Sequence, residues 1–221
     1  MRRLVRIPRD IASEIKRMES HVGRFDEPLL EKMHPENKLN RALITAANKG
    51  ALGEVRALVK RGAEPASRNG VGMRAIDCAR LQDYTKVVEF LEAELNKNLF
   101  YAIKENDFEL FEKALEGGAD PDALCGVLSA LVNCIGFRRW QMAEALIEKG
   151  ADVRKINEHG HSPLMMAVMV GDLKMVKLLV EKGADPYEQN RHTVSAKSLA
   201  ESQGHVSMVD YFEGNGKFDR L

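Results

Sequence analysis

The stretch NEHGHSPLMMAVMVGDLKMVKLLVEKGADP, residues 157–186, decides the fold. Ser162 is a residue type that caps helix N-termini, and Pro163 suits a first helical turn, where no N–H partner is needed. Gly171 suits a left-handed residue that ends this first helix. The sequence then predicts an amphipathic second helix, whose apolar face consists of Leu173, Val176, Leu179 and Val180. Gly183 and the two residues after it predict the end of that helix and a turn.

This pattern recurs along the chain. Related segments begin at Ala42, Arg74, Leu99, Leu131 and Ser195. The distance from Gly150 to Gly183 is 33 residues, and the distance from Gly171 to Gly204 is also 33. A fixed period of this length is typical of stacked repeats, each of which buries its apolar face against its neighbours.

One connection in this series is shortened. Ile76 and Leu99 hold equivalent positions, yet only 23 residues separate them. The intervening LEAELNKN has no Gly or Pro to turn a hairpin. We therefore expect the second helix of one unit to run nearly straight into the next unit. The resulting notch predicts an interrupted binding face, with a partner held mainly by residues 122–195.

The repeated unit resembles the ankyrin repeat, whose period is 33 residues and whose hallmark is Thr-Pro-Leu-His-x-Ala. The resemblance covers roughly residues 39–213, and Ser162-Pro163-Leu164 keeps the core of the hallmark. Other residues replace the hallmark His: Ile44, Asp77, Phe100, Val132, Met165 and Ser198. The resemblance implies an all-α ankyrin-repeat solenoid, an elongated right-handed stack of helix-turn-helix units joined by β-hairpin-like loops.

We expect an N-terminal helical extension over 1–38, the array over 39–213 and a tail over 214–221. The six expected units are 39–68, 69–95, 96–121, 122–153, 154–186 and 187–213. The extension has apolar residues at helical spacing from Ile11 to Val22, so it is either a cap over the first repeat or a free interaction arm. In the last unit Lys197 and Glu201 replace core residues, which predicts a C-terminal cap with a polar outer face.

The composition is that of a folded chain with no net charge. Apolar residues make up 44%, which is enough to form a core, and Lys plus Arg equals Asp plus Glu at 33 each. We therefore expect no nucleic-acid partner. No run of about 18 apolar residues exists, so no membrane span is expected. The three cysteines have no metal-ligand spacing, which favours a reduced compartment. We expect a cytoplasmic protein, or one in the host cytosol if it is a secreted effector.

Apolar residues stand at several positions that would be polar if they met only water. Ankyrin units resemble one another in placing hairpin tips and first helices on a concave, partner-facing side. The candidates on this side are Val71, Met73, Leu81, Leu128, Phe137, Met169 and Val170. They either form an apolar binding strip or, if the register is off by one residue, fill the core between hairpin and helix.

Three histidines, His159, His161 and His192, are also candidate partner-binding residues on adjacent tips. They could bind zinc or sense pH, or they could be exposed tip residues without a shared role. No Cys or carboxylate pattern completes a ligand set, so we expect neither a metal nor another cofactor.

Two further features have alternative interpretations. Arg138, Arg139 and Trp140 could stack on nucleic acid, or they are surface cations beside one core aromatic residue. Cys134 takes a small core position, which favours an inert buried thiol, whereas Cys125 lies at a tip and is the thiol expected to react.

No catalytic motif was found: there is no Gly-x-Ser-x-Gly, phosphate loop or His-Glu-x-x-His. We therefore expect a non-enzymatic module, monomeric on its own, that binds another protein. The alternatives are an inhibitor or immunity protein that blocks an enzyme, or a pathogen-secreted effector that acts on host proteins.

Overall fold

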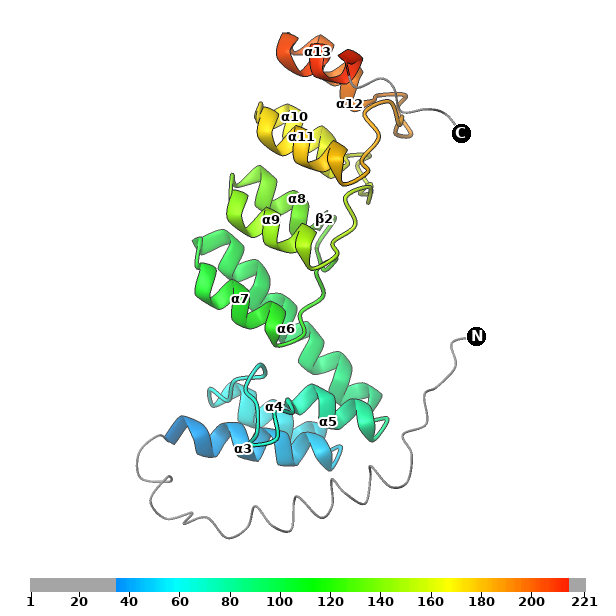
Figure 1. Ribbon diagram of the computed structural model, residues 1–221. Coiled ribbons are helices and arrows are strands. Elements are labelled where there is room, and N and C mark those ends of the chain that lie inside the picture. The colour runs from blue at the N-terminus through cyan, green and yellow to red at the C-terminus, as the bar shows by residue number, and fades with distance from the viewer. Residues whose placement is uncertain (1–34, 215–221) are drawn as a thin grey trace.

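The computed structural model describes residues 35–214, whose helices pair into an elongated stack (Figure 1). The first five helices are α3 (Pro35–Asn48), α4 (Leu52–Lys60), α5 (Ala75–Leu81), α6 (Thr85–Glu105) and α7 (Phe108–Glu116). The remaining helices are α8 (Ala130–Gly136), α9 (Trp140–Glu148), α10 (Pro163–Val170), α11 (Leu173–Glu181), α12 (Ala196–Ser202) and α13 (Val206–Gly214). Between α7 and α8, the strands β1 (Leu124–Cys125) and β2 (Leu128–Ser129) pair antiparallel. An all-α repeat solenoid is the fold that the sequence predicted.

Side-chain caps set the helix boundaries in the fifth repeat. The Ser162 hydroxyl accepts a hydrogen bond from the Met165 backbone N–H at 3.2 Å and starts α10. Gly171 ends α10 with a φ of 79°, a left-handed conformation that favours glycine. Asp172 then caps α11 by accepting from the Met175 backbone N–H at 2.8 Å. The predicted cap and terminator of this first helix are confirmed.

Small residues let the first helices of successive repeats lie close together. α3 packs on α5, α8 on α10, and α10 on α12. Five of the six first helices contribute a buried alanine at the same repeat position, Ala46, Ala79, Ala102, Ala167 and Ala200, and α8 has the buried Cys134 there. A larger side chain there would push neighbouring helices apart, because protein interiors are close-packed.

The helix α6 runs without a break from Thr85 to Glu105, across the expected boundary at 95/96. Its first half packs on α5, and its later part packs on α7 and α8. Asn96 accepts a hydrogen bond from the Asp120 backbone N–H at 2.9 Å, as Asn40 of α3 does from Glu64 at 2.7 Å. The second half of α6 is therefore a first helix in the repeat pattern. The predicted fusion of two units is confirmed.

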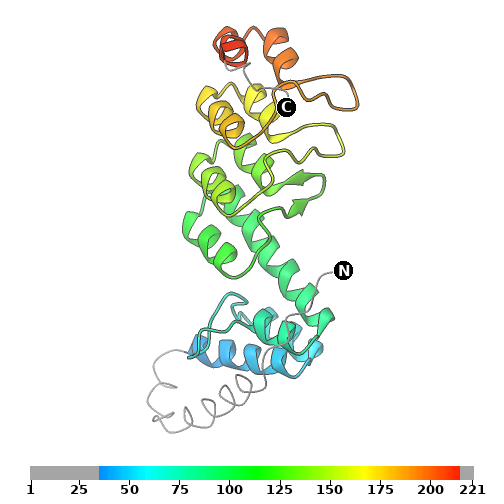
Figure 2. The ribbon, with the colours of Figure 1, turned by 45° about the vertical axis from the view of Figure 1, so that its right-hand side comes forward.

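This fusion reverses the orientation of the repeat units along the array, which we call the reversal of the array below. In an ordinary repeat the chain turns back through a hairpin before each new first helix, but here it continues straight on through α6. The first helix of the third repeat therefore runs parallel to the second helix of the second repeat. Figure 2 shows the consequence: the loops before α8, α10 and α12 project together on one side, and the loop before α5 lies on the other.

Arginine side chains from the loop before α5 bind the end of α7 at the junction where the repeats reverse. Arg74 and Arg68 both donate to the Glu116 carbonyl, at 2.7 and 3.3 Å, and satisfy the C-terminal end of α7. A Cβ on Gly117 would lie 2.7 Å from Ala66, so only glycine allows this approach. The two parts of the array thus hold each other through specific contacts.

The C-terminal repeat ends in charged pairs, as expected for a cap. Lys197 contacts Glu201 at 2.8 Å and Glu213 at 3.2 Å, which raises the pKa of its ammonium group. The predicted N-terminal cap lies mostly in residues 1–34, outside the part of the chain that the structure describes.

Candidate protein-binding surface

Asparagines shape three of the hairpin tips. Asn157 Oδ1 accepts hydrogen bonds from the backbone N–H groups of His159 and His161, both at 2.9 Å. Asn69 and Asn190 make the same pair of bonds in the second and sixth repeats. An asparagine that binds the backbone two and four residues ahead fixes the loop without a long strand ladder. The backbone of each of these three tips is therefore held in a fixed conformation.

The tip of the fourth repeat is built differently. Leu124 stands where the other three tips have asparagine, and it pairs with Ser129 in a short β-ladder. Cys125 pairs with Leu128, and Gly126 turns the hairpin with a φ of 61°. Leu124 is 55% exposed, so this tip presents an apolar side chain.

Thr193 holds a left-handed conformation in the sixth tip, with a φ of 59°. Gly72 and Gly160 occupy the equivalent position in two other tips. A β-branched residue is strained there, at a cost of about 1–2 kcal/mol, part of which the chain entropy of glycine would offset. We expect Thr193→Gly to raise the free energy of unfolding by about 0.5–1 kcal/mol. Thermal melting should shift upward by about 1–4 °C.

The matched control for this change is Thr193→Ala, which removes the β-branch but keeps a Cβ. It should recover only part of the gain, because the Cβ itself opposes the left-handed region. A lower melting temperature for Thr193→Gly than for Thr193→Ala would contradict the assigned strain.

The C-terminal ends of α8 and α10 present two large apolar side chains. Phe137 is 49% exposed and Met169 is 45% exposed. Arg138 joins these ends, because its guanidinium donates to the Val170 carbonyl at 3.0 Å. Phe137 and Met169 therefore lie on neighbouring first-helix ends that are tied together, at the ends of α8 and α10 opposite to the tips.

The other apolar candidates divide into three groups. Met73 and Val170 are half-buried and pack against the core, so the expectation that they point outward is wrong. They follow the alternative interpretation, in which residues between hairpin and helix fill the core. Leu128 is half-buried in β2. Val71 and Leu81 are half-exposed, but they belong to the first part of the array, on the other side of the reversal at α6.

The tip histidines do not come together in a ligand set. His159 and His192 are exposed, and His161 is half-buried. The His192 imidazole lies 3.2 Å from its neighbour Arg191. Within residues 35–214, no three His, Cys, Asp or Glu side chains are grouped so that they could hold a metal ion.

The cluster at 138–140 is used inside the protein. Arg139 donates to the Ile103 and Lys104 carbonyls, both at 3.3 Å, and so satisfies the end of α6. Trp140 is half-buried against the core. The second interpretation of this cluster, cations beside a core aromatic residue, describes the structure.

The cysteines also follow their predicted environments. Cys134 is buried, and this burial raises the pKa of its thiol to about 12. The thiol therefore stays protonated at neutral pH, and a protonated thiol is a poor nucleophile. Cys125 is exposed at the fourth tip.

Sequence comparison agrees with this geometry. Residues 99–190 match the family model for ankyrin repeats, in 3 copies. Residues 99–190 are therefore ankyrin repeats. The matched stretch runs from the second half of α6 to the sixth tip, on one side of the reversal. No curated protein matches the chain. Ankyrin repeats generally serve as protein–protein interaction modules, typically without enzymatic activity.

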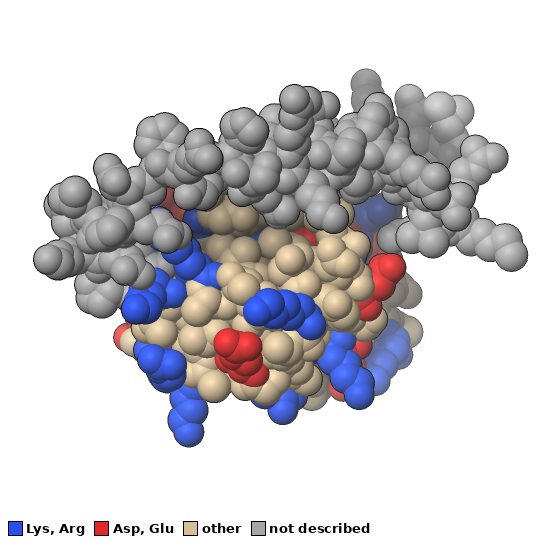
Figure 3. All heavy atoms as spheres, turned by 90° about the horizontal axis from the view of Figure 1, so that it is seen from below, with Lys and Arg blue, Asp and Glu red and all other residues tan. Residues whose placement is uncertain are grey.

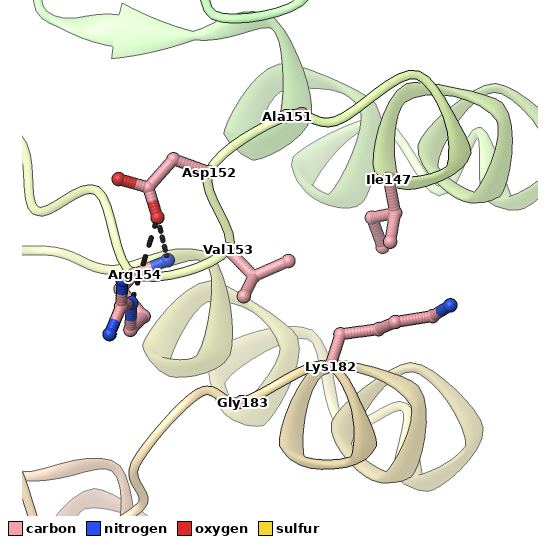
Figure 4. A pocket seen from close by; sticks show the side chains of 7 residues that line it. All are labelled: Ile147, Ala151, Asp152, Val153, Arg154, Lys182 and Gly183. Carbon is pink, nitrogen blue, oxygen red and sulfur yellow. Dashed lines mark hydrogen bonds and ion pairs between the residues drawn. The ribbon is translucent and has the colours of Figure 1, made fainter.

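A hollow of about 300 Å³ lies between the ankyrin repeats at the ends of α9 and α11 (Figure 4). Ile147 and Val153 form its apolar wall, and Lys182 extends along its other side. Arg154 points away from this wall and contacts Asp152 at 4.0 Å. The polar groups therefore do not converge on one point, as they do in a small-molecule site.

The N-terminal end of the array has a mixed surface. On the face shown in Figure 3, lysine and arginine side chains lie around a largely uncharged area, with acidic side chains between them.

Within residues 35–214, no helix is long and apolar enough to cross a membrane.

Sequence reasoning missed two exposed apolar residues at the tips, Leu124 and Ile156. A signal for Leu124 was present, because it replaces the asparagine that Asn69, Asn157 and Asn190 provide in the other tips. Ile156 comes directly before its tip asparagine and carries no such signal.

Proposed function

We propose that this ankyrin-repeat protein binds another protein through the surface formed by the tips before α8, α10 and α12 and the ends of α8 and α10. This surface is called the tip-and-helix surface below. The observation that carries the proposal is the pair Phe137 and Met169, two large apolar side chains left about half exposed on adjoining helix ends. Aromatic and methionine side chains are favoured anchors at protein interfaces.

The energy available at these two residues is useful for binding. Full burial of such a side chain contributes about 1.5–3 kcal/mol, and about half of each remains to be buried. Covering both would therefore contribute about 1.5–3 kcal/mol, which is about a 10- to 150-fold gain in affinity.

The first part of the array is not continuous with this surface. The loop before α5 lies on the other side of the molecule (Figure 2), and its Arg68 and Arg74 are used to cap α7. A partner that spans consecutive tips meets three of them, in the fourth to sixth repeats. This supports the expected use of residues 122–195.

Hydrogen exchange on a captured complex tests this proposal. The full chain is used to capture a partner from a lysate of its source, and amide exchange is then compared with and without that partner. Protection should appear within residues 124–138 and 157–171, with little change over 66–84. Protection confined to residues 66–84 would place the partner on the first part of the array and refute the proposed surface.

The same complex distinguishes scaffold from inhibitor or effector. An adaptor leaves the partner's own activity unchanged, whereas an inhibitor lowers the activity of an enzyme that it covers. A host protein captured in place of one from the source organism would indicate an effector.

A further inference from the structure

A cavity of about 100 Å³ opens between the tips of the fourth and fifth repeats. Leu124 and Val127 line it from the β1–β2 hairpin, and Ile156 and Asn157 line it from the next tip. Leu124 is 55% exposed and Ile156 is 36% exposed. The cavity therefore combines an apolar lining with one amide side chain.

The amide of Asn157 is held in a single orientation. Its Oδ1 accepts from two backbone N–H groups, so the Nδ2 donor must occupy the opposite position. Nδ2 is buried, and within the described residues it has no hydrogen-bond partner. A buried donor without an acceptor carries the full cost of its lost hydration, so an acceptor that reaches it stabilises the site.

The sixth repeat shows what the fifth lacks. Asn190, the equivalent tip residue, donates from Nδ2 to the Gly160 carbonyl of the preceding tip at 2.7 Å. The residue equivalent to Gly160 in the fourth repeat is Val127, within the differently built β-hairpin. The change from an asparagine tip to a β-hairpin therefore coincides with the loss of an internal acceptor.

Charged groups around the cavity limit the ligand further. The Lys155 ammonium is already bonded to the Asp122 carbonyl at 3.0 Å, whereas the Glu158 side chain is exposed beside the cavity. The Lys155 and Glu158 charges are opposite in sign, so together they give the cavity no net attraction for an ionic ligand. The chemistry favours an uncharged ligand that has a carbonyl oxygen next to a compact aliphatic group.

We propose that the cavity is a subsite for an aliphatic residue of a bound polypeptide, whose main-chain carbonyl accepts from Asn157 Nδ2 while its side chain contacts Leu124 and Ile156. The proposal rests on the tip-and-helix surface as the binding face, and it specifies the partner's chemistry at one point of that face. Asn157 thereby selects a segment whose carbonyl is free to bond.

The test uses N-acetyl-leucine methylamide as the probe and the full chain labelled for NMR. Titration should shift the side-chain amide signals of Asn157 and the methyl signals of Leu124 and Ile156. N-acetylglycine methylamide, which has the carbonyl without the side chain, should bind about tenfold more weakly or worse.

Asn157→Asp is the informative variant, because it keeps an oxygen for the two tip hydrogen bonds and removes the donor. Affinity for the leucine probe should fall by about tenfold or more. Asn69→Asp makes the same change in a distant tip and should leave affinity unchanged. If Asn157→Asp perturbs the tip, Ile156→Ser tests the apolar side of the cavity and should weaken binding by about fivefold.

Equal shifts with the leucine and glycine probes would mean that the apolar contact contributes nothing, and no shifts at Asn157 would mean that its amide binds no carbonyl of the probe. Either result would overturn the subsite. That result would leave the hydrogen-exchange test of the larger surface unaffected, so the two proposals can fail separately.

Discussion

Replacing Phe137 and Met169 together by glutamate should weaken partner binding by about a hundredfold or more and leave the fold intact. Each change removes apolar burial at the interface and places a carboxylate where the partner would exclude water. A hundredfold loss corresponds to about 2.7 kcal/mol, close to the burial energy of the two side chains alone. Calorimetry with the captured partner measures the loss. Melting temperature should change by less than about 2 °C, because both side chains are half exposed.

Two control variants separate binding from folding. Val206→Glu places the same charge at an apolar side chain that is 67% exposed at the start of α13, away from the tips, and should leave affinity unchanged. Val170→Glu has the opposite signature, because Val170 packs against the core and a buried charge there should lower the melting temperature. If the Phe137 and Met169 double variant melts as low as Val170→Glu, these residues are core and the proposed surface is refuted.

The fold could be predicted from the sequence because each repeat contains the residues that set its own helix boundaries. Ser162 and Gly171 stand at the start and end of α10 as capping chemistry requires, and the spacing from Ile76 to Leu99 predicted the fusion within α6. Local rules of this kind depend on a few neighbouring residues and need no knowledge of distant contacts.

The binding surface was harder to predict, because the exposure of each apolar side chain depends on how far that side chain turns toward the core. Met169 and Val170 are adjacent and both apolar, yet Met169 is exposed and Val170 packs against the core. Only the position of each residue around the end of α10 separates them, and a shift of one residue in the register exchanges their roles. The reversal of the array was also not predicted from the sequence. The sequence predicted that two helices fuse, but it did not predict that Val71 and Leu81 would lie on the other side of the reversal.

Lys97→Pro should destabilise the protein by about 3 kcal/mol or more, because Lys97 lies in the middle of the continuous α6. Proline removes the backbone N–H bond at this position and clashes with the carbonyl four residues earlier. It also disfavours the helical conformation of the preceding Asn96, whose side chain accepts from Asp120. Leu95 and Leu99 on either side of Lys97 are almost fully buried, so a kink here also disturbs the packing of the core. Circular dichroism should show a fall in melting temperature of about 6–12 °C.

Lys97→Ala is the matched control for this prediction. The Lys97 side chain is 73% exposed, and its ion pair with Glu94, at 3.5 Å, lies on the surface. The effect of this substitution should stay within about 0.5 kcal/mol, since exposed ion pairs contribute little. X-ray scattering should show altered dimensions for Lys97→Pro alone, as a kink in α6 changes the angle between the reversed parts. A Lys97→Pro variant that melts like Lys97→Ala and keeps the wild-type scattering profile would show that α6 is not one continuous helix in solution. The array would then resume the ordinary turn between its second and third repeats.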